Sequence, residues 1–115
     1  MSAYHFTAEE IKREEEEINR AKKNPAYFAP LYERYYKRIW LFVYRRTDDE
    51  AVSDDLTAQI FIHALHHLNR YEHRGLPFSS WLFRIASNEV LQFYRKTNRL
   101  PVICVDDSGW QRLSE

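Results

Sequence analysis

Apolar residues recur at helical spacing through most of this chain, and this pattern predicts helices. Thr7 and Glu10 form a capping box, so a first helix is expected from Ala8 to about Lys23. The glutamate run 14–17 gives this helix a charged face, and its apolar contacts are few. We therefore expect a loosely packed helix whose glutamates face solvent or, as the less common alternative, shield a basic surface.

A second helix is expected to follow Asn24, which can cap it, and to end near Thr47. Pro30 falls inside this segment, so the pattern predicts a bend or a break near Tyr27, because proline interrupts helical hydrogen bonding. The residues expected in the core share helical spacing. They are Phe28, Leu31, Tyr35, Ile39 and Phe42.

Asp48 is the expected cap of a third helix that reaches about Tyr71. The residues expected on its buried side are Val52, Leu56, Phe61, Ala64, Leu65 and Leu68. Its other side then carries Asp54, Asp55 and Gln59. These polar residues either extend the acidic start of the helix, which suits the helix dipole, or contact a partner.

A fourth helix is expected within 78–99, with Ser79 as its cap and Phe78 closing over Phe83 in a hydrophobic staple. On a helical wheel, one set of residues falls within about 80° and forms what we call the polar stripe. It consists of Trp81, Arg84, Asn88, Gln92, Arg95 and Arg99. The apolar side, expected to pack on the core, holds Leu82, Phe83, Ala86, Val90, Phe93 and Tyr94.

The polar stripe differs from an ordinary solvated helix surface, which usually mixes lysine and glutamate at salt-bridging spacing. Arginine, asparagine and glutamine carry the donors and acceptors that match phosphates and base edges. Trp81 beside these side chains is either a core residue or a platform on which an unpaired base stacks. The stripe thus points to nucleic acid, with a solvated basic helix as the alternative.

Composition fits a single all-α domain. The chain has 115 residues with two glycines and four prolines, and no alternating apolar pattern predicts a sheet. The lone Cys104 cannot form an internal disulfide, which suits a reducing cytoplasm. No apolar run reaches the length of a membrane span, and residues 1–10 lack the order of a secretory signal. We therefore expect a soluble, cytoplasmic protein without a membrane partner.

Charge is segregated along the chain, although the net charge is zero. Residues 25–47 carry five basic side chains against one acidic, and residues 48–73 carry six acidic against one basic. The sign changes again in 74–99, with five basic side chains against Glu89 alone. Such separation suits a protein that binds DNA with one surface and a basic partner with another.

Two motifs resemble those of a known family. The run 78–88, followed by Arg95 and Lys96, resembles the promoter-reading part of conserved region 2 in extracytoplasmic-function (ECF) sigma factors. The run 54–61 resembles the acidic helix of the same family, which docks on the clamp helices of the RNA polymerase beta-prime subunit. The motifs occur in the family's order and spacing, and the resemblance covers roughly residues 24–99.

The resemblance implies a compact bundle of three to four helices, similar to sigma region 2, that binds core RNA polymerase and recognises and helps to melt the minus-ten promoter element. It divides the chain into an N-terminal charged helix (1–23), the region 2 domain (24–99) and the start of a linker (100–115). In the family, a second DNA-binding domain follows such a linker, and the resemblance leads us to expect that the given residues stop before it. An anti-sigma factor is a further partner that such proteins often have.

The same resemblance implies the site residues. For the polymerase they are Asp54, Asp55 and Gln59, with Ala58 and Gln59 standing where the family often has Gln and Glu. In the family, the loop that corresponds to 72–77 helps to form a pocket for a base flipped out of the promoter. Its implied border consists of Tyr71, Arg74, Phe78 and Ser80. The other implied DNA contacts are the polar stripe residues Trp81, Arg84, Asn88, Gln92, Arg95 and Arg99, of which Gln92 replaces a frequent aspartate.

Two other functions remain open from the residues. His63 and His67 are spaced to present two imidazoles on one helix face, so a metal site is an alternative, with His73 or a distant acid as third ligand. A helical adaptor that binds only protein through its acidic face is another. No phosphate-binding loop or nucleophile motif predicts catalysis, and no cofactor is expected.

Overall fold

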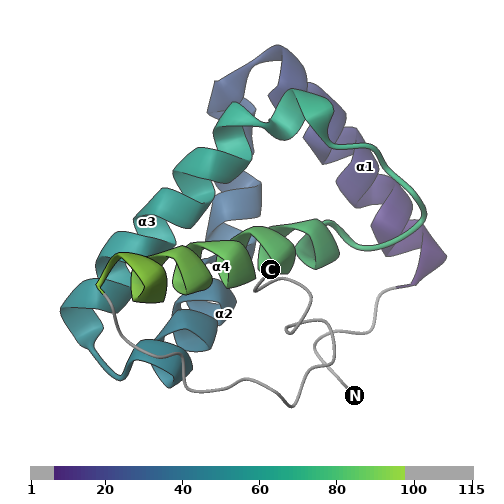
Figure 1. Ribbon diagram of the computed structural model, residues 1–115. Helices are drawn as coiled ribbons and strands as arrows, with labels where there is room; N and C mark the ends of the chain where they lie inside the picture. The colour runs from purple at the N-terminus through teal and green to yellow at the C-terminus, as the bar shows by residue number, and fades with distance from the viewer. Residues whose placement is uncertain (1–6, 98–115) are drawn as a thin grey trace.

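The computed structural model describes residues 7–97 and shows a helical bundle with two short 3-10 turns (Figure 1). In chain order, the elements are α1 (Ala8–Lys23), η1 (Pro25–Phe28), α2 (Ala29–Thr47), α3 (Glu50–His66), η2 (Leu68–Arg70) and α4 (Phe78–Lys96). The described part of the chain contains helices and turns but no strand, so the predicted all-α fold is confirmed.

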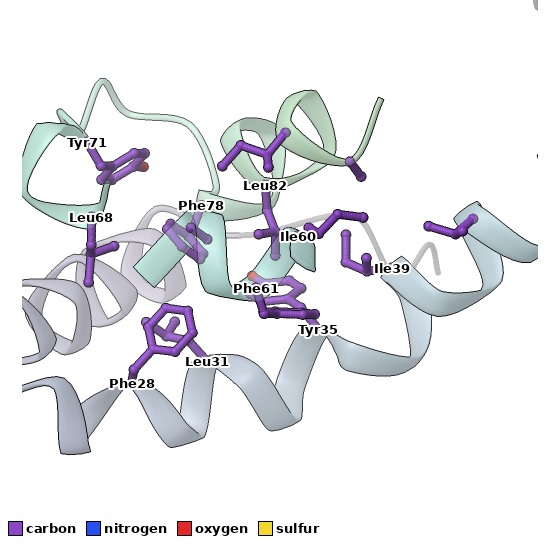
Figure 2. Close-up of a cluster of buried hydrophobic side chains, with 14 of the residues drawn as sticks. Phe28, Leu31, Tyr35, Ile39, Ile60, Phe61, Leu68, Tyr71, Phe78 and Leu82 are labelled. Atoms are coloured by element: carbon purple, nitrogen blue, oxygen red, sulfur yellow. The ribbon is translucent and has the colours of Figure 1, made fainter. Parts of the chain in front are cut away.

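The core lies where α2, α3 and α4 pack against one another, and α1 packs beside the two 3-10 turns and α4. Figure 2 shows side chains from all three central helices meeting in this core. The largest fully buried side chains are Tyr35, Phe78, Leu31, Ile39, Ile60, Leu68, Leu82 and Val43. Burial of this apolar surface supplies the main driving force for folding.

Helix α1 begins as predicted but is not loosely packed. Its capping box is present, with the Glu10 backbone N–H donating to Thr7 Oγ1 at 3.0 Å. Ile18 and Ala21 are each 2% exposed, and Glu14 is 3% exposed. The expectation that the 14–17 run faces solvent is therefore wrong for Glu14. Its carboxylate is buried because other helices supply hydrogen-bond donors to it.

The break predicted near Tyr27 is present. Asn24 Oδ1 accepts the Ala26 backbone N–H at 3.1 Å and caps η1, and the α-helical path starts only at Ala29. Pro30 consequently lies in the first turn of α2, where its missing N–H costs little. The second helix ends at Thr47, as expected.

The predicted cap of the third helix is off by one residue. Asp48 adopts the left-handed conformation with φ 54° and ends α2, its N–H donating to the Tyr44 carbonyl at 2.8 Å. Asp49 caps α3 instead, through Oδ1 and the Val52 N–H at 3.0 Å. Aspartate tolerates the left-handed region better than most residues, so the first aspartate makes the turn and the second caps. Helix α3 also ends earlier than expected, at His66, and η2 continues the chain.

The start of the fourth helix differs from the prediction. Helix α4 begins at Phe78, and Pro77 at its N-cap position offers no side-chain cap. Ser79 is buried within the first turn and does not cap. Phe83 packs on Phe42 at 5.3 Å between ring centroids, so the predicted staple is also wrong. The reason is tertiary: Phe78 turns into the core, and its backbone N–H donates to Glu14 Oε1 of α1 at 3.0 Å.

Periodicity predicted most of the core correctly. The residues expected there are buried, except some aromatic and aliphatic side chains at the edges that are only partly buried: Phe42, Val52, Leu65, Phe83 and Phe93. The buried residues of α2, α3 and the middle of α4 that the pattern did not single out are Val43, Ser53, Thr57, Ile60, Ile85 and Leu91. Helix α3 is buried on more than one side, because both α2 and α4 pack against it.

Candidate nucleic-acid and protein interfaces

The polar stripe is a surface feature of α4. Arg84, Asn88, Gln92 and Arg95 are exposed along the helix, and Trp81 is partly buried at its base. Arg99 lies outside the described residues. We call the exposed part, Arg84 to Arg95, the polar face. Its amide and guanidinium groups project from a rigid helix, which is the arrangement that groove and strand recognition requires.

A hollow of about 360 Å³ lies at the base of the polar face, between the start of α4 and the segment that leads into it. We call it the α4 pocket. Its lining residues come from both sides: Arg70, Tyr71, Glu72, Arg74, Leu76, Pro77, Ser80, Trp81 and Arg84. The volume falls in the range of small-ligand sites. Arg84 belongs to both the pocket and the polar face, so the two surfaces are continuous.

Aromatic side chains support the pocket. The rings of Tyr71 and Trp81 lie 5.1 Å apart, and Phe78 lies 5.3 Å from Tyr71 and 5.4 Å from Trp81. Phe78 is only 1% exposed and does not line the pocket, so it belongs to the support beneath the pocket and not to the predicted contact surface. Burial raises the pKa of Tyr71 above its ordinary value, so its hydroxyl keeps its proton to a higher pH than that of a free tyrosine.

The rim of the pocket is basic. Arg70, Arg74 and Arg84 line it, against Glu72 as its acidic residue. Arg74 Nη2 lies 3.1 Å from Glu72 Oε1, but both side chains are about three-quarters exposed, at 75% and 74%, so this ion pair holds Arg74 weakly. The excess of guanidinium groups gives the pocket a positive potential that attracts phosphate.

Sequence reasoning did not name four of the lining residues as site residues, namely Arg70, Glu72, Leu76 and Pro77. The signal that marks this segment is Gly75, whose φ of 77° lies in the left-handed region that glycine adopts without strain. The turn at Gly75 bends the chain before α4. It brings Arg70 and Leu76 to one hollow, although they are on opposite sides of the turn in sequence.

The acidic face of α3, which consists of Asp54, Asp55 and Gln59, is exposed, but its residues have different surroundings. The indole Nε1 of Trp40 in α2 donates to Asp54 Oδ1 at 2.7 Å, and Trp40 stacks on Tyr44 at 5.1 Å. Asp55 and Gln59 turn the other way and line a hollow shared with α4. The three predicted polymerase contacts therefore belong to two adjoining surfaces, since neighbouring helix positions differ by about 100°.

Gln92 and Lys96 of α4 line the same hollow as Asp55 and Gln59. Gln92 is therefore at the border between the polar face and α3, whereas Arg84 and Asn88 lie nearer the α4 pocket. The structure thus brings Gln92 of α4 close to Asp55 of α3. Neither of the two sequence motifs indicated this proximity.

The histidines of α3 form a stacked pair. The rings of His63 and His67 lie 4.3 Å apart, and His63 Nδ1 is 3.6 Å from Glu89 Oε2 of α4. His73, the candidate third ligand, instead lies 3.6 Å from Glu15 of α1. Within residues 7–97, no three histidine, cysteine, aspartate or glutamate side chains gather in a way that could hold a metal ion. The same residues include no helix with the length and apolar character needed to cross a membrane.

The family model and the curated relatives that match this chain all belong to sigma factors. A model of sigma-70 region 2 matches residues 31–100, which contain nearly all of α2 and the whole of α3 and α4 but not α1. The ECF RNA polymerase sigma factor BldN of Streptomyces coelicolor is 32% identical over 76 residues, covering 65% of this chain and 29% of that protein. SigM of Bacillus subtilis is 28% identical over 79 residues, covering 69% of this chain and 47% of that protein.

SigL of Mycobacterium tuberculosis, another ECF RNA polymerase sigma factor, is 26% identical over 90 residues, covering 77% of this chain and 51% of that protein. The chain thus spans between about a third and a half of the length of these curated relatives. No solved structure matches the chain. On the family match, which covers more than half of the sequence, and on these relatives, the chain belongs to the sigma-70 region 2 family, as a non-enzymatic region 2 domain of the ECF type.

Proposed function

We propose that this chain binds core RNA polymerase and recognises and helps to open the minus-ten promoter element. The observation that carries the proposal is the continuity of two surfaces on one helix. The exposed polar face of α4 leads, through Arg84, directly into a basic pocket with an aromatic support. Duplex or strand backbone on the face and an unpaired base in the pocket are the ligands that this shape and charge fit together.

On the polar face, Arg84 and Arg95 contact phosphates, and Asn88 reads a base edge. The family resemblance adds Arg99 to these phosphate contacts. Phosphate contacts give affinity that falls with salt, whereas an amide with both a donor and an acceptor distinguishes bases. Gln92 takes a lesser role in DNA contact, because it shares a hollow with Asp55 and Gln59.

In the α4 pocket, the partly exposed Trp81 offers a ring face to an extruded base. Tyr71, Arg74 and Ser80 offer hydrogen-bonding groups around it. Extruding a base costs a few kcal/mol of stacking and pairing, and stacking on an aromatic side chain returns roughly 1–3 kcal/mol. Because the pocket accepts only an unpaired base, binding favours the melted strand.

On α3, Asp54, Asp55 and Gln59 hold the domain on the beta-prime clamp helices of core polymerase. Their exposure and the acidic charge of this face support contact with a basic partner. An anti-sigma factor that covers the same surfaces would block both activities. The protein then acts in the cytoplasm, where core polymerase and promoter DNA are located.

The test begins with transcription by core polymerase and the full-length protein on a promoter library, which identifies the minus-ten sequence. A labelled single-stranded oligonucleotide with that sequence then measures capture by the polymerase complex. The double variant Arg84→Ala/Asn88→Ala should lose about tenfold to a hundredfold in capture, the loss expected for one phosphate and one base contact. Its affinity for core polymerase should not change.

Arg45→Ala is the matched control, because Arg45 is an exposed arginine on α2 outside the α4 pocket. This variant should capture the oligonucleotide like the wild type. A protein-only adaptor gives a different result: the wild type binds core polymerase but supports no transcription and captures no DNA. That outcome, or undiminished capture by the double variant, overturns the proposal.

A further inference from the structure

Helix α1 holds the segment between α3 and α4 at several points. Lys22 Nζ donates to the Tyr71 carbonyl at 2.8 Å, at the start of the segment. Glu15 Oε1 lies 3.6 Å from His73 Nε2. At the far end, Glu14 Oε1 accepts the Phe78 N–H at 3.0 Å. In Figure 1, the segment runs alongside α1 before it enters α4.

Glu14 is the central residue of this arrangement. Its carboxylate is 3% exposed, and both of its oxygens accept hydrogen bonds. Oε1 binds α4 through Phe78, while Oε2 accepts from Tyr35 Oη and from Arg34 Nη1 at 2.9 Å. One buried charge therefore joins α1, α2 and α4. Such a charge is tolerated because it is paired and fully hydrogen-bonded.

Glu14 also replaces the cap that α4 lacks. The first N–H groups of a helix have no partner within the helix, and a negative charge is favourable at that end. Pro77 offers no side-chain cap, and the Phe78 N–H points to Glu14. Arg34 fixes the position of the carboxylate, since it also binds Glu17 at 2.8 Å and 2.9 Å.

Both walls of the α4 pocket are thus attached to α1. Tyr71 on one wall is held at its carbonyl by Lys22, and the helix turn that carries Ser80 and Trp81 is held at its first residue by Glu14. Phe78, whose N–H Glu14 binds, supports Tyr71 and Trp81 from beneath. The exposed acids of α3 have no part in these hydrogen bonds.

We propose that α1 presets the α4 pocket for an unpaired base and that Glu14 and Lys22 are its positioning residues. This inference rests on the proposed function, because it concerns the same pocket. It adds an element that the region 2 match, residues 31–100, does not include. A pocket whose walls are fixed before binding loses less conformational entropy when a base enters, so α1 raises the affinity for melted DNA.

The test measures two affinities for each variant within the assembled polymerase complex: that for core polymerase and that for the single-stranded minus-ten oligonucleotide. Glu14→Ala should reduce oligonucleotide capture about tenfold, the size expected for weakening one stacked base. Affinity for core polymerase should stay within about twofold of the wild type. Glu14→Gln keeps an acceptor oxygen for the Phe78 N–H and should recover part of the loss.

Val43→Ala controls for a general loss of stability, because Val43 is 0% exposed in α2 and lies outside the α4 pocket. At temperatures where it is folded, it should capture the oligonucleotide normally. Lys22→Met covers the case in which Glu14→Ala does not fold, since it removes the donor to Tyr71 but keeps the aliphatic chain. Lys23→Met is its exposed neighbour and should leave capture unchanged.

Normal capture by folded Glu14→Ala or Lys22→Met overturns the inference, as does a parallel loss of capture and polymerase affinity. The proposed function fails in a different way, namely when the wild type itself does not capture the oligonucleotide. A wild type that captures DNA, with Arg84→Ala/Asn88→Ala impaired and both α1 variants normal, would retain the proposed function and reject the role of α1.

Discussion

The indole of Trp81 lies at the boundary between the hydrophobic core and the α4 pocket. One side of it contacts Tyr71 and Phe78, and the other lines the pocket. From the sequence, this tryptophan was either a core residue or a stacking platform. The structure shows why both descriptions fit: the ring is held by the core but remains partly exposed.

Substitution of Trp81 separates stacking from packing. Trp81→Phe keeps an aromatic face and should lose little oligonucleotide capture, whereas Trp81→Ala removes it and should cost about 1–3 kcal/mol of binding free energy. The measurement is the dissociation constant of the oligonucleotide in the polymerase complex. Phe83→Ala, which removes a partly buried ring on the side of α4 that faces Phe42, is the control for lost packing. Equal weakening by Phe83→Ala and Trp81→Ala would show that stability, not stacking, is responsible.

Residues whose environment depends on helical period were predictable. Arg84 and Asn88 are exposed and Leu82 and Ala86 are buried, as the wheel indicated. The environment of Glu14 was not predictable, because its partner Phe78 is 64 positions away in sequence. Four consecutive glutamates look equivalent along the chain, and only the packed helices select one of them for burial.

Among the elements, the junction between α2 and α3 is the shortest connection between two α-helices of the described bundle. Two aspartates with different backbone conformations form it: Asp48 is left-handed at φ 54°, and Asp49 is extended at φ −147°. Ser53 ties the junction to both helices, with Oγ donating to the Asp49 carbonyl at 2.8 Å and lying 3.1 Å from Thr47 Oγ1. The junction thereby fixes the direction in which α3 presents its acidic face.

The two aspartates should respond in opposite ways to substitution. Asp49→Ala removes the cap and should lower the free energy of unfolding by about 1 kcal/mol. Asp48→Gly suits the left-handed conformation and should leave stability unchanged or raise it by less than about 1 kcal/mol. Urea unfolding followed by circular dichroism measures both. If Asp48→Gly proved the more destabilising of the two, the assignment of turn and cap would be reversed.

Local signals predicted the elements where both partners are close in sequence. The capping box of α1 and the break before α2 needed only Thr7, Glu10 and Pro30, and they are present. The cap of α4 was mispredicted because Ser79, near the expected start of the helix, matched the local pattern for an N-cap. The actual acceptor comes from another helix, and no local pattern shows it.

At the scale of the whole molecule, α1 compensates part of the basic charge of α2. Arg34 is bound by Glu14 and Glu17, and interaction with the Glu17 carboxylate raises its pKa above the ordinary value. Arg38 lies over the Tyr35 ring, and Arg46 over Phe42. These cations have partners within the bundle. Part of the basic charge of α2 is therefore neutralised within the bundle, which the segregated sequence alone did not indicate.

The buried network around Glu14 should also set the response of the fold to alkali. Burial and the hydrogen bond to Glu14 raise the pKa of Tyr35 above the ordinary 10.0. An unfolded tyrosine loses its proton near pH 10, whereas folded Tyr35 keeps it to higher pH. The unfolded state therefore binds fewer protons above pH 10, and the stability that is complete below this pH is lost as the pH rises further, by at most about 1.4 kcal/mol per pH unit from this residue.

Tyr35→Phe removes this titration and should flatten the decline in the free energy of unfolding between about pH 9 and pH 11, although the variant starts from lower stability because Glu14 loses a donor. Urea unfolding at several pH values gives the slopes. Tyr27→Phe is the control, because Tyr27 is 50% exposed, and it should keep the wild-type slope. If the free energy of unfolding fell equally steeply with pH in Tyr35→Phe and in the wild type, Tyr35 would have the same pKa in the folded and the unfolded protein. The hydrogen bond from Tyr35 Oη to Glu14 would then contribute little to holding α1 in place. The measurement therefore also tests one of the contacts through which α1 is proposed to support the α4 pocket.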